Sequence, residues 1–228
     1  GQKRLLVIAC ALLLAVSGGM LWDVGYNYDG LQGSPLTKFH PSSYLIFALL
    51  AWRAMQSRDP VRFVNDGMAR RPAAAWLLVL SFVLLFATAL RGGPGLAGFI
   101  DTFGAPAALA LLLEEADEAD VATLTLTLHV VMTANALLGL FEFASSTLIF
   151  PYRFDGAVHL EDTRSTSLQG HPLMNAALTG VYTISLMAGA KAMRPWLKAG
   201  LVLLQCAALV VFGGRTAIVV TLAMTPLF

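Results

Sequence analysis

Long, continuous apolar segments constrain this chain more than any other feature of its sequence. Segments such as 74–90 and 121–143 consist mostly of apolar residues, and short polar segments separate one from the next. A helix that crosses the hydrocarbon core of a bilayer needs roughly 20 such residues. The apolar residues also run without the alternation that membrane β-strands require. We therefore predict an all-α, polytopic transmembrane helix bundle, formed as a single transmembrane domain by residues 1–228.

The composition agrees with a lipid environment. Charged residues make up 13% of the chain, whereas soluble domains carry about 25%. A low charge content also fits an unusually apolar soluble core, but the length of the segments favours the membrane. Cys10 and Cys206 both lie inside apolar segments, so they are interpreted as packing residues rather than as a disulfide or a metal pair. We expect no metal, no cofactor and no nucleic-acid partner.

Polar segments divide the chain into seven or eight predicted spans. The basic start and the apolar segment 5–21 also resemble a signal peptide, but its apolar region would be only about 7–15 residues long, so a membrane anchor is favoured. Residues 56–73 are interpreted as a polar connection, and about 22–43 and 144–171 as outer loops. The predicted spans are 5–21, 44–55, 74–90, 96–113, 121–143, 172–190, 199–212 and an eighth that begins at Thr216.

The distribution of basic residues predicts the orientation, because short cytoplasmic loops collect Lys and Arg. With a cytoplasmic N-terminus, ten of the 15 basic residues fall on the inner side and five on the outer side. The inner residues are Lys3, Arg4, Arg53, Arg58, Arg62, Arg70, Arg71, Lys191, Arg194 and Lys198. The outer residues are Lys38, Arg91, Arg153, Arg164 and Arg215.

Four outer arginines run against this trend and are the first candidates for a binding site. Arg91 and Arg215 lie in glycine-rich turns, and Arg153 and Arg164 lie in the outer loop 144–171. A guanidinium group is a planar fork that matches phosphate oxygens in a bidentate manner. The set therefore predicts a site for a lipid-linked phosphate or diphosphate. The alternative is that each arginine extends separately to the lipid headgroups.

Two carboxylates lie in or near the predicted apolar layer. Asp101 lies inside the fourth predicted span, and Glu142 lies near the outer end of the fifth. Asn135, Gly139 and Glu142 are spaced i, i+4 and i+7, so they share one helix face. A buried ionisable group usually has a partner, which leaves three roles open: an acid, a base, or an ion pair with an arginine. A local helix cap is an equal alternative for Asp101.

The segment 164–175 leads from the outer loop into the sixth predicted span. Pro172 fits the first turn of a helix, where no amide donor is needed, and the free amides of a helix start favour an anion. Arg164, Gly170, His171 and Asn175 are therefore expected to converge near one helix N-terminus on the outer surface. An ordinary transition from loop to helix remains the alternative.

This segment resembles the Arg…Gly…Pro…Asn pattern that opens the conserved region of O-antigen ligases and related polysaccharide polymerases. The Gly-Gly-Arg-Thr-Ala sequence at 213–217 resembles the Ser-Arg-(small) turn found one helical hairpin later in that family. Two further segments, 35–44 and 100–103 with the following Pro106, are similar to the exopolysaccharide-polymerase branch. The similarity covers most of the chain in order and topology.

The resemblance implies a glycan polymerase or ligase in the bacterial inner membrane. Such proteins take glycan from an undecaprenyl-diphosphate carrier at the periplasmic face and pass it to a glycan or lipid acceptor, with the lipid tail between spans. Fixed arginines would stabilise the charge that grows on the departing diphosphate. By resemblance, Arg164 and Arg215 would bind the diphosphate, with Arg91 and Arg153 as further candidates. Asp101, Glu142, Asn175 and Gly170 would support the site.

The family also has more spans and a later outer loop that supplies a histidine general base. We therefore expect this chain to be the N-terminal part of a longer protein and to be inactive alone, with His171 as a substitute base that does not match the family motif. A transporter or flippase is the alternative, with Asp101, Glu142 and His129 as a proton relay. The chain shows no paired repeat, which makes a transporter less favoured. A non-catalytic assembly subunit is the third hypothesis.

Overall fold

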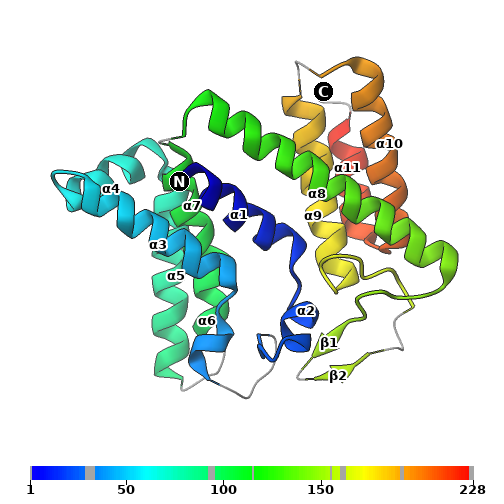
Figure 1. Cartoon of the computed structure of the whole chain (residues 1–228), viewed down its shortest axis with the longest axis horizontal. Helices are drawn as coiled ribbons and strands as arrows, with labels where there is room; N and C mark the ends of the chain where they lie inside the picture. The colour runs from blue at the N-terminus through cyan, green and yellow to red at the C-terminus, as the bar shows by residue number, and fades with distance from the viewer. Residues whose placement is uncertain are drawn as a thin grey trace. The chain divides into compact units, whose positions relative to one another are not determined.

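The computed structural model describes residues 2–28, 34–91, 96–114, 116–154, 156–159, 163–190 and 193–225. Helices dominate this part of the chain, which confirms the all-α prediction (Figure 1). The helices are α1 (Gln2–Ala15), α2 (Gly18–Asp23), η1 (Pro35–Lys38), α3 (Pro41–Gln56), α4 (Pro60–Arg70), α5 (Pro72–Leu90), α6 (Leu96–Phe99), η2 (Ile100–Gly104), α7 (Ala105–Glu114), α8 (Glu118–Ser145), α9 (Pro172–Gly189), α10 (Pro195–Val211) and α11 (Arg215–Met224). Strands β1 (Arg153–Phe154) and β2 (Ala157–Val158) form an antiparallel pair between α8 and α9.

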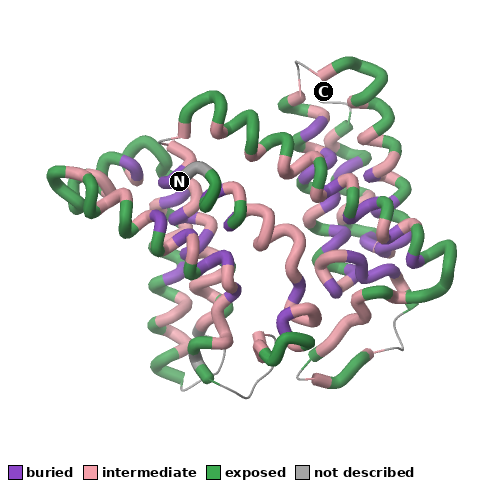
Figure 2. The backbone as a smooth tube through the Cα atoms, viewed as in Figure 1, coloured by how far each residue is buried: buried purple, intermediate pink, exposed green. Residues whose placement is uncertain are grey.

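Among the residues that the structure describes, three helices are long and apolar enough to cross a membrane, at Pro72–Leu90, Ala97–Glu114 and Glu118–Ser145. The same part of the chain also holds shorter apolar helices at Arg4–Ala15, Pro195–Val211 and Arg215–Met224. Most residues of the apolar helix α5 are exposed or only half-buried, as the colours of the backbone in Figure 2 indicate. A large exposed apolar face is unfavourable in water and marks a membrane or partner surface. The structure therefore supports a membrane protein.

The chain forms two compact units. Unit 1 consists of residues 1–13 and 30–127, and unit 2 of residues 14–29 and 128–228. In unit 1, α7 packs against both α3 and α5. The aliphatic core between α3 and α7 includes Ile46, Leu49, Ala108 and Leu112.

Two predicted segments of the chain have a different local structure. Residues 56–73 were expected to be a polar connection but contain α4, whose N-cap Asp59 accepts the Arg62 amide (3.0 Å). Phe63, Val64 and Met68 form an apolar face on α4. The neighbouring arginines make the average composition of this segment polar, so the face was overlooked. The predicted first span 5–21 is not one helix either. Helix α1 ends at Ala15, because Ser17 caps the short helix α2.

Both ends of unit 1 have polar contacts between segments that are distant in sequence. At one end, Glu114 forms ion pairs with Arg71 and with Arg70 (3.4 Å). At the other end, the His40 amide donates to Asp101 Oδ2 (2.7 Å). These contacts hold the end of α4, the start of α5 and the end of α7 together at one side, and the start of α3 against η2 at the other.

Unit 2 is built from α8, α9, α10 and α11, with small residues at the helix contacts. Ala136, Ala176 and Ala208 are buried in one apolar cluster around Phe212. A Cβ placed at Gly139 of α8 would lie 2.5 Å from the Phe212 ring. Small residues permit the close approach of helices that membrane proteins use.

We predict that Gly139→Ala destabilises the protein by about 1–3 kcal/mol, because the new methyl group overpacks the buried Phe212 ring. Thermal unfolding of the detergent-solubilised protein, followed by circular dichroism, measures this. Gly200→Ala in α10 is the matched control, since a Cβ there meets nothing within 4 Å. The double variant Gly139→Ala/Phe212→Leu should be less destabilised than the sum of its parts. A Gly139→Ala protein as stable as the parent would contradict this packing.

Candidate functional site

The buried carboxylate of Glu142 organises the loop between α8 and α9. Glu142 has an exposed fraction of 0%. Its Oε1 accepts the amide N–H of Ile149 (2.9 Å), and its Oε2 accepts those of Thr166 (2.9 Å) and Ser167 (2.8 Å). One side chain therefore binds both ends of the loop. The structure gives Glu142 backbone amides as partners, whereas the sequence suggested an acid, a base or an arginine ion pair.

The rest of the same α8 face binds the end of this loop. Ser165 Oγ donates to the Gly139 carbonyl (2.7 Å), and Ser167 Oγ donates to the Asn135 carbonyl (2.7 Å). Asn135 Oδ1 accepts the Leu168 amide (3.1 Å). The shared face predicted for Asn135, Gly139 and Glu142 is thus the surface on which the turn at 165–168 lies. Because these contacts involve the consecutive loop residues 165–168, this turn is fixed along its length.

The backbone of the turn is strained at Ser167. Ser167 has a φ of +42°, in the left-handed region that non-glycine residues rarely adopt. Such a residue costs of order 1–3 kcal/mol and persists only where surrounding contacts fix it. The hydrogen bonds to Glu142 and Asn135 provide those contacts.

Arg164 immediately precedes this turn and lies against the turn between α10 and α11. A Cβ at Gly213 would lie 2.6 Å from Arg164 Cδ. Gly213 also has a φ of +66°, so its position favours glycine both for conformation and for space. The absence of a side chain at Gly213 lets the Arg164 side chain cross this turn.

Arg164 and Arg215 line the same pocket of unit 2. The pocket has a volume of about 660 Å³, and its other walls are Leu173, Val210, Gly213, Thr216 and Ile218. Arg215 is the first residue of α11 and is exposed. Two arginines far apart in the sequence, one from the loop and one from α11, therefore line one cavity.

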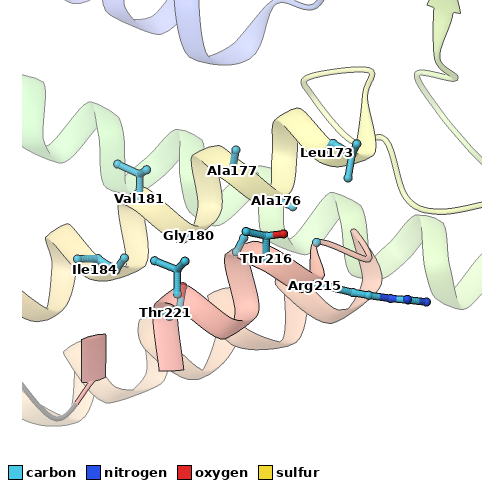
Figure 3. Close-up of a pocket in the computed structure, with 12 residues that line it drawn as sticks. Leu173, Ala176, Ala177, Gly180, Val181, Ile184, Arg215, Thr216 and Thr221 are labelled. Carbon is cyan, nitrogen blue, oxygen red and sulfur yellow. The ribbon is translucent and has the colours of Figure 1, made fainter. Parts of the chain in front are cut away.

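A second, apolar pocket of about 380 Å³ lies between α9 and α11. Leu173, Arg215 and Thr216 line both pockets, so the two cavities are neighbours. Figure 3 shows Val181 and Ile184 of α9 along this groove, with Arg215 extending from the start of α11. Gly180 and Ala176 leave room for α11, since a Cβ at Gly180 would lie 3.3 Å from that of Ala217. The apolar pocket between α9 and α11 therefore adjoins the pocket that Arg164 and Arg215 line.

The start of α9 follows the sequence-based expectation in part. Pro172 occupies the first turn, and His171 is the N-cap, with Nδ1 accepting the amides of Leu173 (3.2 Å) and Met174 (3.4 Å). Asn175 is buried, and its Nδ2 donates to the Thr166 carbonyl. Gly170 has a φ of +62° and lies close to Ser17. These residues fix the junction of loop and helix, with His171 Nδ1 acting as an acceptor.

The remaining predicted residues lie elsewhere. Arg153 of β1 forms an ion pair with Asp23 at the end of α2 (3.2 Å). Arg91 is exposed at the C-terminal end of α5, in unit 1. Asp101 also belongs to unit 1 and lies in the π-helical turn η2, a distortion frequent at functional sites. Its Oδ2 accepts the backbone amide of His40.

His129 near the middle of α8 forms a hydrogen bond with the hydroxyl group of Tyr182 in α9 (2.7 Å). Tyr182 is buried together with Met132 and Leu186. The hydrogen bond therefore gives His129 of α8 a partner on α9. Within the described part of the chain, no group of three or more His, Cys, Asp and Glu could hold a metal ion.

Compared with known proteins, the chain matches no family model, no curated protein and no solved structure. The resemblance to O-antigen ligases therefore remains a prediction from the motifs. Sequence reasoning missed Ser165, Ser167 and Gly213, which shape the site. The glycine pair at 213–214 marked a turn, but its role as room for Arg164 depends on tertiary contacts.

We predict that cysteines at positions 164 and 215 are cross-linked within one chain by a short bifunctional thiol reagent, because both side chains line one pocket. The variant carries Arg164→Cys and Arg215→Cys, with Cys10→Ala and Cys206→Ala to remove the native thiols. Mass spectrometry of the intact protein counts one added linker and no free thiol.

The matched control pairs Arg215→Cys with Lys198→Cys in the same background. Lys198 lies near the start of α10, about 20 Å along the helix from the pocket at 1.5 Å per residue. This pair should take up two singly attached reagents. Equal cross-linking of both pairs, or none at 164 and 215, would show that the two arginines do not share a pocket.

Proposed function

We propose that unit 2 binds the diphosphate of a lipid-linked glycan between Arg164 and Arg215. The observation that carries this proposal is the pocket that both arginines line, next to an apolar groove. Arginine forks bind phosphate oxygens in a bidentate manner, and two of them suit a diphosphate. This chemistry, together with the resemblance, supports a glycan polymerase or ligase of the O-antigen ligase and exopolysaccharide-polymerase type.

In this mechanism the arginines act on the leaving group. When an acceptor hydroxyl attacks the sugar carbon that bears the diphosphate, the bond to that oxygen breaks and negative charge grows on the diphosphate. Fixed cations that meet this developing charge lower the barrier, because they need no rearrangement during the reaction. Arg164, next to the turn at 165–168, and Arg215, at the start of α11, would take this role.

The apolar groove suits the start of the lipid tail. Its walls are mostly Leu, Ala, Val, Ile and Gly side chains of α9 and α11. Burying each methylene group of a chain contributes about 0.8 kcal/mol. A tail in the groove would place the attached diphosphate at Arg215, which lines both cavities.

We further propose seven or eight spans in a bacterial inner membrane, with the N-terminus in the cytoplasm. Contacts within each unit support the alternation of sides. Glu114 pairs with Arg71, and both residues belong to predicted inner segments. His40 of a predicted outer loop binds Asp101 in the outer part of the fourth predicted span, and Arg164 contacts Gly213 at another predicted outer turn. The basic residues then accumulate on the cytoplasmic side.

His171 is a poor general base in this arrangement. Its Nδ1 lone pair accepts two amides at the start of α9, so the neutral ring carries its proton on Nε2 and has no second lone pair. We propose that His171 caps α9, and that the base which takes the acceptor proton is supplied by another group.

A transporter or flippase for a lipid-linked anion could use the same two arginines. It would also need a proton or ion pathway. Glu142 is bound to amides and His129 to Tyr182, and these two α8 residues lie about 20 Å apart along the helix at 1.5 Å per residue. A direct relay between them is too long for proton transfer, so the polymerase or ligase is favoured.

We predict that Arg164→Lys or Arg215→Lys reduces long polymer in cells by about tenfold or more. Lysine keeps the charge but loses the fork, and a hydrogen bond to a charged group contributes about 1.5–3 kcal/mol. Gel profiles of the polymer, with immunoblots for protein amount, measure the effect. Arg62→Lys, at an exposed ion pair on α4, is the control. Unchanged polymer from both variants would refute the assignment.

We predict that a thiol reagent which does not cross membranes labels Arg153→Cys but not Arg62→Cys in intact spheroplasts. Both variants lack the native Cys10 and Cys206. Arg153 lies in the proposed periplasmic loop and Arg62 in the proposed cytoplasmic helix α4. Both thiols should react after detergent lysis. The reverse labelling in spheroplasts would invert the proposed orientation.

A further inference from the structure

We infer that Glu142 is a positioning residue that holds Arg164 in the pocket shared with Arg215. The inference rests on the proposed function, because it assigns how one arginine of that site is kept in place. Glu142 acts through the loop, because its carboxylate accepts the amides of Ile149, Thr166 and Ser167.

The position of this carboxylate is costly for packing alone. Glu142 is fully buried and lies in the last turn of α8. A helix C-terminus carries partial negative charge, which disfavours a carboxylate there, and a buried charge is expensive unless it is hydrogen-bonded. Three amide donors offset these costs. An apolar side chain would fill the space without them, so the carboxylate is explained by the loop that it binds.

The contacts connect the carboxylate to Arg164 through a short path. Thr166, bound to Glu142, is two residues after Arg164. Between them, Ser165 is fixed by its hydrogen bond to the Gly139 carbonyl of the same helix. From the other side, Asn175 donates to the Thr166 carbonyl. Arg164 therefore directly precedes a turn that is bound to α8 on one side and to α9 on the other. Its side chain lies against Gly213 and lines the pocket.

Arg215 is held in a different manner. It is the first residue of α11, and the carbonyl of Gly213 accepts its amide (3.0 Å). Disruption of the loop should therefore displace Arg164 and leave Arg215 in place. This difference makes the role of Glu142 separable from a general role in folding, since its loss should matter only while Arg164 is present.

The experiment is a double-mutant cycle with farnesyl diphosphate as the probe. Binding to the detergent-solubilised chain is measured for the parent, Glu142→Gln, Arg164→Ala and the double variant. Glutamine presents an amide donor where the carboxylate accepted, so one end of the loop loses its partner. Farnesol and inorganic diphosphate, each alone, separate the contributions of the tail and the head.

We expect Arg164→Ala to weaken probe binding about tenfold, a change of about 1.4 kcal/mol. Glu142→Gln should cause most of the same loss, and the double variant should bind no more weakly than Arg164→Ala. Coupled residues give such non-additive effects, whereas independent ones add. Glu118→Gln, an exposed glutamate in the first turn of the same helix, is the matched control and should bind as the parent does.

The outcomes separate the two hypotheses. If the parent does not bind the probe, or Arg164→Ala binds it as tightly as the parent, the proposed function fails, whatever Glu142 does. If Arg164→Ala loses binding but Glu142→Gln keeps it, only the positioning role fails. If the two losses multiply in the double variant, Glu142 acts independently of Arg164, which also overturns the inference.

A milder variant covers the case in which Glu142→Gln does not fold. Ser165→Ala removes only the hydrogen bond to the Gly139 carbonyl, next to Arg164. The same cycle with Arg164→Ala then decides. A loss of binding that disappears in the Arg164→Ala background supports positioning through the loop, and unchanged binding by Ser165→Ala overturns it.

Discussion

The hydrogen bonds that Glu142 accepts from three backbone amides connect most features of unit 2. They join both ends of the long loop to the last turn of α8. The loop places Arg164 against the α10–α11 turn and leads into α9 at Pro172. Because α9 packs against both α10 and α11, the loop that Glu142 helps to fix leads into a helix that lines the pocket.

Sequence patterns predicted the long helices well, because length and apolarity carry the signal. The predicted span 172–190 corresponds to α9, and 121–143 lies within α8. The pattern failed where local chemistry competed with hydropathy. Ser17 and the two following glycines end α1 early and start a new helix. In α4, the apolar face is narrow and flanked by arginines, so its average composition resembles a loop.

The part of the site that depends on the spacing of side chains along a helix could be predicted from the sequence. The spacing of Asn135, Gly139 and Glu142 fixed a shared helix face, because 3.6 residues per turn require it. Their partners could not be read from the sequence, since the donors are mostly backbone amides and every residue except proline has one. The strained φ of Ser167 could not be predicted either, because nothing about a serine in the sequence indicates a positive φ. Only tertiary contacts decide such positions.

The identity of the partners of Glu142 also bears on how an anion site can work. The sequence left open an ion pair between a carboxylate and an arginine, which would hold the arginine but also offset its charge. In the structure both carboxylate oxygens accept amides, so Glu142 fixes the backbone next to Arg164 without itself neutralising the guanidinium. Amide donors can balance a buried carboxylate because they supply polarity without a net charge. Position and charge are thus supplied by different residues, and a diphosphate need not displace Glu142 to reach Arg164.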